Sequence, residues 1–372
     1  MKITRIETIP VLVPIKPELA IRFSGGLHDV SPFLVVKVHT DEGIVGLGEV
    51  SCTPRWSGED HWSAKHFIDS IIAPALVGAD PRSIEAASAA MDRVIAGNVF
   101  TKSAIQMACF DIWGKAVTMP VYRLLGDKVR NRVALKFSVS GAEPRRAAEI
   151  AKWAVTQGFR TVKLKVGGKT KDDFDRVSAV RREVGPDVRI GVDANGGWSF
   201  VDAVRAIHLL EDRCAIAFVE QPVSAEDLEG MVQVRREATV PLVADESVFD
   251  LAQAQAVARA GAADVFSLYV GKGGGIEGAR KMATVADAAG LTCTIGSNLE
   301  LGIASAAMIH LALSTPAVDP ERVPCDIIGP LYYGTDLLTE PLPIRDGFAY
   351  PLEMPGLGVD LDDEQVRRFA VG

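Results

Sequence analysis

Hydrophobic residues follow two different patterns along the chain. Up to about residue 130, apolar positions first alternate with polar ones and then recur at helical spacing, which predicts strands followed by helices. The strands are expected within 1–15 and 33–50, with a hairpin turn at Asp41–Gly43, and the helices within 61–127. This first part therefore predicts an α+β unit.

From about residue 131 the pattern changes to short apolar strands that alternate with amphipathic helices. The strand segments are, in chain order, VALKFSVSG, FRTVKLKVG, VRIGVDAN, CAIAFVEQP, PLVADES, ADVFSLYVG and LTCTIGSN. An eighth strand is expected near Pro324–Ile328. Such alternation predicts an α/β fold with a parallel sheet covered by helices. Seven or eight units in about 200 residues favour a TIM-type barrel over an open doubly wound sheet.

The chain is expected to divide into three parts: 1–130, a barrel at 131–335, and a Pro- and Gly-rich tail at 336–372 that packs back on the first part. The net charge of −8 argues against a nucleic-acid-binding surface. No run of ~18 apolar residues could span a membrane, and the N-terminus is too interrupted by charge and proline for a signal peptide. Five scattered cysteines without a CxxC pair favour reduced thiols and a cytoplasmic location.

Two lysines, Lys163 and Lys165, stand two residues apart in the apolar segment TVKLKVGG. Residues i and i+2 of a strand face the same side, so both ammonium groups project together. Two like charges in a place of low dielectric lower each other's proton affinity, and one lysine could then be a neutral base near neutral pH. Taken alone, however, such a pair is more often two solvent-exposed lysines without a catalytic role, because lysine is rarely buried.

Three successive strands of the barrel end in an acid: Asp193 in VDAN, Glu220 in VEQP and Asp245 in ADES. Neighbouring parallel strands lie about 4.8 Å apart, so these carboxylates should stand side by side at the barrel mouth. They repel one another unless a cation lies among them, and oxygen ligands suit Mg²⁺, with Mn²⁺ as the alternative. One such acid could simply cap the next helix, but three in a row favour a metal site.

Lysines beside a metal site predict chemistry at a carbon acid. A Mg²⁺ ion held by three carboxylates can bind a substrate carboxylate and stabilise the dianion that forms when the α-proton leaves. A lysine on the neighbouring strand can accept that proton. A lysine or histidine base combined with Mg²⁺ is typical of enolase-superfamily sites.

These motifs resemble the enolase superfamily, and within it the muconate-lactonizing-enzyme subgroup of the mandelate racemase/muconate lactonizing enzyme family. The resemblance covers essentially the whole chain. AIQMACFDIWGKAVTMPVYRLLGD resembles the helix that closes the capping domain, KLKVG the lysine strand, and VDANGGW, FVEQP and ADES the metal-ligand strands. It implies a modified (β/α)7β TIM barrel with an α+β capping domain completed by the C-terminal tail. It also implies one Mg²⁺ per site and, by analogy alone, a homo-oligomer.

The resemblance also implies roles for single residues. Asp193, Glu220 and Asp245 would bind Mg²⁺, Lys165 would be the base on one face of the substrate, and Lys163 would tune it and contact the substrate carboxylate. Two loops, Arg22–Pro32 and Ser51–Asp60, would close over the substrate. The other expected polar contacts and loop contacts are Asn195, Glu246, Arg22, His28, Arg55, Trp56, Asn298 and Glu300. Glu300 is equally plausible as a charge in the first turn of a helix.

One position departs from the subgroup pattern. The subgroup normally has a second lysine at the end of the sixth strand, facing Lys165 across the substrate. Here Tyr269 stands at that interval, and Lys272 follows three residues later, in the expected loop. The seventh strand, TIGSNLE, has no histidine of the mandelate racemase type. Either Tyr269 or Lys272 could act on the second face, or Tyr269 could simply pack in the barrel.

Chemistry on a single face is therefore expected. Lys165 alone could remove an α-proton and then protonate a leaving hydroxyl in a syn β-elimination, whereas racemisation needs groups on both faces. We expect dehydration of a small hydroxylated amino or imino acid, such as a hydroxyproline. The alternatives are a racemase or epimerase of an amino-acid derivative, a cycloisomerase of a muconate-like acid, and a catalytically silent barrel that binds a small carboxylate.

Overall fold

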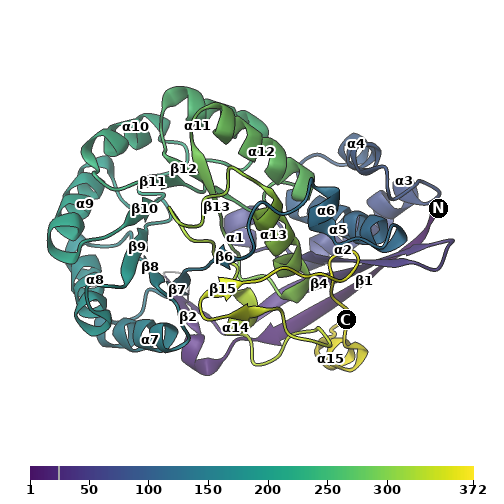
Figure 1. Ribbon diagram of the computed structural model, residues 1–372, viewed down its shortest axis with the longest axis horizontal. Coiled ribbons are helices and arrows are strands. Elements are labelled where there is room, and N and C mark those ends of the chain that lie inside the picture. The colour runs from purple at the N-terminus through teal and green to yellow at the C-terminus, as the bar shows by residue number, and fades with distance from the viewer. Residues whose placement is uncertain (24–25) are drawn as a thin grey trace.

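A curved parallel sheet ringed by helices packs beside an antiparallel sheet with helices of its own (Figure 1). The computed structural model describes residues 1–23 and 26–372, and side chains within 1–20 and 29–372. The predicted α/β class, with a barrel of the TIM type and a separate N-terminal α+β unit, is confirmed.

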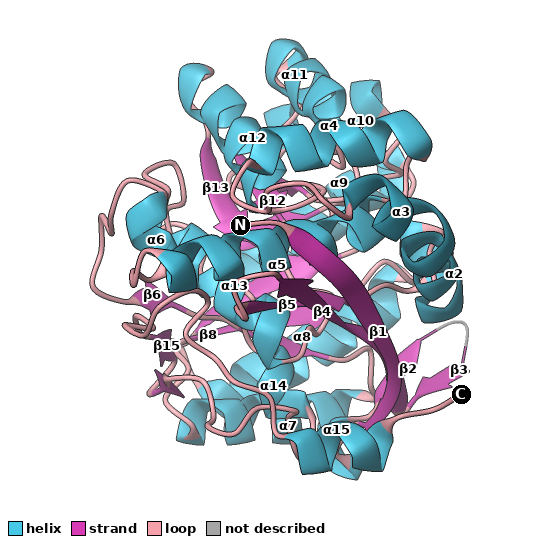
Figure 2. Cartoon of the chain, turned by 90° about the vertical axis from the view of Figure 1, so that its right-hand side faces the viewer, coloured by secondary structure: helices cyan, strands magenta, loops and turns pink. Residues whose placement is uncertain are grey.

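The N-terminal sheet has the order β1-β4-β5 and is antiparallel. Its strands are β1 (Ile3–Pro14), β4 (Val30–Thr40) and β5 (Val45–Val50). β1 runs along the outer edge of the sheet (Figure 2), and the predicted hairpin turn at Asp41–Gly43 is confirmed. The expectation of a loop at Arg22–Pro32 is wrong: β2 (Ile21–Phe23) and β3 (Gly26–His28) pair there as a hairpin, and β4 has begun by Val30.

Helices of the N-terminal part pack beside this sheet. They are α2 (His61–Phe67), α3 (Ala73–Leu76), α4 (Ile84–Val94), α5 (Val99–Ala116) and α6 (Val121–Leu124), with a π-helical turn at Ile68–Ile72. Of these helices, α2, α3 and α5 contact the strands of the sheet. α5 is buried on nearly every side because it lies between β5 and the barrel. Gly48 of β5 permits this approach, since a Cβ there would overlap the carbonyl oxygen of Ala104.

The barrel sheet runs in chain order, with every strand parallel to the next. Its strands are β7 (Phe137–Val139), β8 (Thr161–Lys165), β9 (Arg189–Asp193), β10 (Phe218–Glu220), β11 (Leu242–Ala244), β12 (Val265–Leu268) and β13 (Thr292–Ile295). The helices that follow them are α7 (Pro144–Thr156), α8 (Thr170–Val184), α9 (Phe200–Cys214), α10 (Leu228–Glu237), α11 (Leu251–Ala260), α12 (Ile276–Ala288) and α13 (Gly302–Ser314).

The barrel closes with less regular structure than the sequence predicts. Cys325 makes a single parallel bridge to Leu135, and the backbone N–H of Asp326 donates to Ile295 O at 2.8 Å. The eighth strand expected at Pro324–Ile328 is thus one bridge long. The first predicted strand is divided, because β6 (Val133–Ala134) leaves the barrel to pair antiparallel with β15 (Phe348–Ala349), which also pairs with β14 (Ile344–Arg345).

Polar contacts from α5 and β5 fix the two parts to each other. Ser103 Oγ donates to Val270 O at 3.0 Å, in the turn between β12 and α12. Glu49 of β5 accepts from the backbone N–H groups of Leu301 and Ala304, at 2.8 and 3.1 Å. Because the first N–H groups of a helix lack partners inside it, a buried carboxylate at the start of α13 satisfies them.

The C-terminal tail returns to the N-terminal sheet after α14 (Gly329–Tyr332). Near the C-terminus, the tail forms α15 (Asp363–Phe369), which lies beside β1. Val371 N donates to Pro10 O at 2.9 Å. The buried carboxylate of Asp111 accepts from the N–H groups of Leu47 in β5 and Leu357 in the tail, at 2.9 and 2.8 Å. One side chain of α5 thereby holds the sheet and the tail together. The expected division of the chain into parts at residues 130 and 335 stays a prediction.

Two further expectations concern the cysteines and the membrane. All five cysteines are free and buried, as expected for reduced thiols. Among the described residues, no helix combines the length and the apolar character needed to cross a bilayer.

We predict that Asp111→Ala destabilises the fold by about 3 kcal/mol, because it leaves two buried N–H groups without acceptors. It also removes the partner of Lys115, whose Nζ lies 2.7 Å from Asp111 Oδ2. Urea unfolding followed by circular dichroism measures the effect. Asp212→Ala, at an exposed aspartate, is the matched control and should change little. Equal stability of the two variants would contradict the role given to Asp111.

Candidate active site

The strand ends at the barrel mouth bring the predicted lysines and acids together. Parallel register pairs Lys165 at the end of β8 with Asp193 at the end of β9, and Asp193 with Glu220 at the end of β10. Asp245 follows directly after β11, the next strand of the sheet. All three carboxylates are buried. The side-by-side arrangement expected from the spacing therefore exists.

The lysines of β8 contact these carboxylates directly. Lys163 Nζ lies 2.6 Å from Glu220 Oε1, 3.3 Å from Asp193 Oδ2 and 2.8 Å from Asp326 Oδ2. Lys165 Nζ lies 2.6 Å from Asp193 Oδ2. The Lys163 side chain is buried, whereas the Lys165 side chain is 37 % exposed. Of this pair, Lys165 is the one that a bound molecule can reach.

The charges of the site set the proton affinities of both lysines. Burial alone would lower the pKa of Lys165, but the charge and hydrogen bond of Asp193 together with the charge of Glu220 raise that pKa above its ordinary value. The pKa of Lys163 is raised in the same way by Asp326, Glu220 and Asp193. The expectation of a neutral lysine is therefore not met by this arrangement, since carboxylate contacts exceed the mutual repulsion of the two ammonium groups.

The carboxylates themselves are strongly perturbed. Burial, together with the nearby Asp193 and Asp245, raises the pKa of Glu220 to about 8. Burial would also raise the pKa of Asp193, but Lys165 and Lys163 hold it below its usual range. Negative charge is thus expensive at Glu220 unless a further cation compensates it.

These carboxylates fit a divalent cation by their chemistry. Glu220 Oε2 is buried and has no hydrogen-bond partner among the described residues, which is costly for a carboxylate oxygen. Oxygen donors of this kind are preferred by Mg²⁺. In the described part of the chain, no group of three acid, histidine or cysteine side chains is arranged to hold a metal ion. Lys163, Lys165 and Lys272 contact the carboxylate oxygens instead.

Three more of the expected residues reach the mouth. Asn195 Oδ1 accepts from Lys165 Nζ at 2.8 Å, and Asn195 Nδ2 donates to Glu246 Oε1 at 2.8 Å. Trp56 Nε1 donates to the same oxygen of Glu246 at 3.2 Å. Trp56 lies on α1 (Pro54–Ser57), a short helix inside the segment predicted as a loop. Burial and Asp245 raise the pKa of Glu246 to about 7.

The end of β13 joins the site to the N-terminal part. Asn298 Nδ2 donates to Ser51 O at 3.2 Å, which connects the seventh strand to the loop that carries Trp56. Glu300 accepts from Ser297 Oγ at 2.5 Å and from Asn298 N at 3.0 Å, and burial raises its pKa. Glu300 therefore organises its own turn.

The remaining loop residues are not brought into the site by any described contact. Arg55 is exposed on α1. The backbones of Arg22 and His28 belong to β2 and β3, but their side chains lie outside the described residues. The roles expected of these three stay predictions.

Tyr269 and Lys272, the two candidates for the second face, both contact Asp245. Tyr269 Oη donates to Asp245 Oδ2 at 3.1 Å. Lys272 lies in the turn after β12, as expected, but its side chain is fully buried and its Nζ lies 2.7 Å from Asp245 Oδ1. Burial and Asp245 raise the pKa of Tyr269 well above its ordinary value.

Sequence reasoning missed two residues of the site. Asp326, beside the closing bridge, contacts Lys163 and also Lys136 of the first barrel strand, at 3.2 Å. Gln221 accepts from Asp245 N and Ser247 N, at 3.0 and 3.1 Å, and so fixes the end of β11. The acid in the expected eighth strand and the Gln of FVEQP were the available signals, because both directly adjoin barrel-strand ends.

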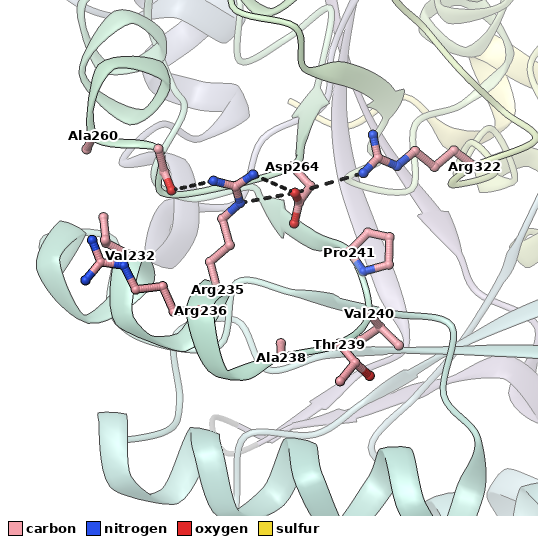
Figure 3. Close-up of a pocket in the computed structure, with 11 residues that line it drawn as sticks. Val232, Arg235, Arg236, Ala238, Thr239, Val240, Pro241, Ala260, Asp264 and Arg322 are labelled. Atoms are coloured by element: carbon pink, nitrogen blue, oxygen red, sulfur yellow. Dashed lines mark hydrogen bonds and ion pairs between the residues drawn. The ribbon is translucent and has the colours of Figure 1, made fainter.

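A cavity of about 400 Å³ lies at the opposite end of the barrel, where β11 and β12 begin (Figure 3). Arg235 points into it and is engaged by Asp264, with Nη2 2.9 Å from Oδ1, and by Gly261 O at 3.0 Å. The active sites of TIM barrels lie at the other, C-terminal end of the strands. This cavity is therefore separate from the lysines and carboxylates.

Comparison with known protein families identifies the family to which the chain belongs. The family model "Mandelate racemase / muconate lactonizing enzyme, N-terminal domain" matches residues 5–126, and the model "Enolase C-terminal domain-like" matches residues 145–366. The chain belongs to the mandelate racemase/muconate lactonizing enzyme family. It is thus a member of the enolase superfamily in its muconate-lactonizing-enzyme subgroup, as the motifs predicted.

Several relatives within this family match along their whole length. The N-succinyl-L-Arg/Lys racemase of Bacillus cereus is 34% identical over 100% of this chain and 98% of its own, and its crystal structure superposes with a TM-score of 0.95. Muconate cycloisomerase 1 of Pseudomonas putida is 32% identical, covering 99% and 98% of the two chains. A dipeptide epimerase of Enterococcus faecalis, solved with Mg and the dipeptide L-Leu-L-Tyr, is 31% identical, covers 97% of this chain and all of its own, and has a TM-score of 0.91.

These relatives define the chemistry at a coarse level. The chain is an enolase-superfamily enzyme, a lyase or an isomerase. Enzymes of this family carry out Mg²⁺-dependent proton abstraction.

We predict that Mg²⁺ raises the melting temperature of this protein and that EDTA reverses the shift. Binding to the folded state alone stabilises it by about 2.7 kcal/mol at a concentration one hundred times Kd. Asp193→Asn removes one charged oxygen of the site and should abolish the shift. Asp175→Asn, on the solvent-facing part of α8, should retain it. Equal Mg²⁺ shifts in both variants, measured by differential scanning fluorimetry, would argue against a metal at Asp193.

Proposed function

We propose that this enzyme removes the α-proton of a small carboxylate with Lys165 and then eliminates water on the same face. The substrate would be a small hydroxylated amino or imino acid, such as a hydroxyproline. One observation carries the proposal: Lys165 is partly exposed at the mouth, whereas Lys272 is buried and Tyr269 donates its hydroxyl proton to Asp245. One lysine can serve both proton transfers of a syn elimination.

Asp193, Glu220 and Asp245 would hold Mg²⁺ in this proposal, and Lys163 would neutralise negative charge beside it. When bound, the cation would polarise the substrate carboxylate and balance the charge of Asp193 that now favours the protonated form of Lys165. The unpartnered oxygen of Glu220 supports this assignment.

The two proton transfers can be assigned to atoms of Lys165. Its neutral amine accepts the proton from the α-carbon, and Asn195 Oδ1, 2.8 Å from Nζ, orients it. The resulting ammonium donates a proton to the β-hydroxyl as the bond between the β-carbon and that oxygen breaks. The C–H electron pair becomes the new carbon–carbon double bond, water leaves, and the amine is restored. The products are water and an α,β-unsaturated acid.

The relatives favour a second candidate, racemisation or epimerisation of an amino-acid derivative. The similarity to the Bacillus cereus racemase and the Enterococcus faecalis epimerase supports it. In that case Tyr269 or Lys272 would have to exchange a proton on the other face. Cycloisomerisation, the reaction in the name of the Pseudomonas putida relative, needs one face and is compatible with Lys165 alone. A silent carboxylate-binding barrel would retain Mg²⁺ binding without proton exchange.

We predict that a screen of hydroxylated amino and imino acids in D₂O with Mg²⁺ finds a substrate that exchanges its α-proton and loses water. Lys165→Ala should slow both processes by about 10²- to 10⁴-fold, since it removes the general base. Proton NMR follows the exchange and the vinylic product signal. Lys171→Ala, at an exposed lysine of α8, is the control and should retain activity.

The same measurement separates the alternatives. Interconversion of enantiomers without loss of water would contradict the dehydratase proposal and support the racemase. A screen in which no carboxylate exchanges would support the silent barrel.

A further inference from the structure

We infer that Tyr269 and Lys272 are positioning residues that clamp Asp245, and that neither exchanges a proton with the substrate. The inference rests on the proposed function for the identity of Asp245 as a metal ligand. It concerns the two residues on which the choice between one-face and two-face chemistry depends.

The hydrogen bonds of Lys272 leave it no proton for a substrate. Its Nζ lies 2.7 Å from Asp245 Oδ1, 2.8 Å from the main-chain oxygen of Asp245 and 2.8 Å from Ser267 O. A lysine ammonium has three protons, and each therefore has a buried acceptor. Lys272 thus holds the side chain and the backbone of Asp245 at once, and ties both to the end of β12.

Tyr269 holds the other oxygen of the same carboxylate. Its Oη lies 3.1 Å from Asp245 Oδ2, so the two oxygens of Asp245 each have a donor. Lys272 Nζ also lies 4.6 Å from the centre of the Tyr269 ring, where the ring face attracts a cation. The tyrosine and the lysine therefore support each other as well as Asp245.

The Tyr269 ring has no room to turn toward the substrate. On one side lies Trp56, with ring centres 5.3 Å apart. On another lies Gly296, where even a Cβ atom would overlap the ring at Cε2. A movement of the phenol out of this position would break its contact with Asp245. The ring is therefore fixed by its neighbours.

The N-terminal part locks this arrangement from outside. Trp56 packs against Phe100 and Phe249, with ring centres 5.9 and 4.9 Å away, and donates to Glu246. Phe100 also fills the space beside Gly271, in the turn that carries Lys272. The clamp on Asp245 is consequently built by both parts of the molecule.

The test uses the full-length protein and titrates Mg²⁺ alone by isothermal titration calorimetry. Tyr269→Phe keeps the ring and removes the donor to Asp245, so Mg²⁺ affinity should fall about 10- to 100-fold, as for other groups that orient a metal ligand. Lys272→Met should weaken Mg²⁺ binding at least as much. If Lys272→Met does not fold, the Mg²⁺ affinity of Tyr269→Phe alone decides whether the clamp exists. Tyr350→Phe, in the tail, is the matched control and should bind Mg²⁺ like the unchanged protein.

A second measurement separates a positioning role from a proton-transfer role. With the carboxylate found in the screen, Tyr269→Phe at saturating Mg²⁺ should exchange the same enantiomer as the unchanged protein. Unchanged Mg²⁺ affinity together with loss of exchange for one enantiomer would overturn the inference and make Tyr269 an acid or base. If the unchanged protein exchanges no carboxylate, the proposed function fails, while the Mg²⁺ titration of Tyr269→Phe still decides whether the clamp exists.

Discussion

A chain of alternating buried charges inside the barrel is the constraint on which this site depends. Lys136 contacts Asp326, Asp326 contacts Lys163, Lys163 contacts Glu220 and Asp193, and Asp193 contacts Lys165. Removal of one partner from such a buried pair leaves an uncompensated charge, which costs about 3–5 kcal/mol. The lysines and carboxylates therefore hold one another in place, and strand register aligns Lys165 with Asp193 and Asp193 with Glu220.

The same network explains why the pKa values of Lys163 and Lys165 are raised and why a cation suits the site. Lysine contacts neutralise Asp193, while Glu220 has a raised pKa and one oxygen without a partner among the residues that the structure describes. The buried carboxylates stand at the ends of neighbouring strands, and a further positive charge there would compensate them. Lys165 can act as a base only if a positive charge other than its own compensates these carboxylates. In the proposed function, the metal site and the base are thus parts of one charge balance.

Much of this could be predicted from the sequence because it follows the strand period. Lys163 and Lys165 share a face at spacing two, and the acids recur once per strand–helix unit, so regular structure places them. Asp326 was missed although an eighth strand was expected around it, because its contacts with Lys136 and Lys163 depend on how the barrel closes at a single bridge. The segment from Arg22 to Pro32 was assigned as a loop because its hairpin is short and rich in glycine. The direction of the Lys272 side chain depends on tertiary contacts that no local pattern encodes.

The contacts of the N-terminal part make the site one-sided. Ser103 and Phe100 of α5 contact the turn after β12. Trp56, from the loop after β5, donates to Glu246. Glu49 and Ser51 contact the residues that follow β13. Tyr269 and Lys272 are buried beneath these contacts, whereas the side chain of Lys165 at the end of β8 is partly exposed. A symmetrical barrel mouth would offer two faces of a substrate to two groups. Here Tyr269 and Lys272 are buried under the N-terminal part, and in the proposed function the partly exposed Lys165 would be the accessible proton acceptor.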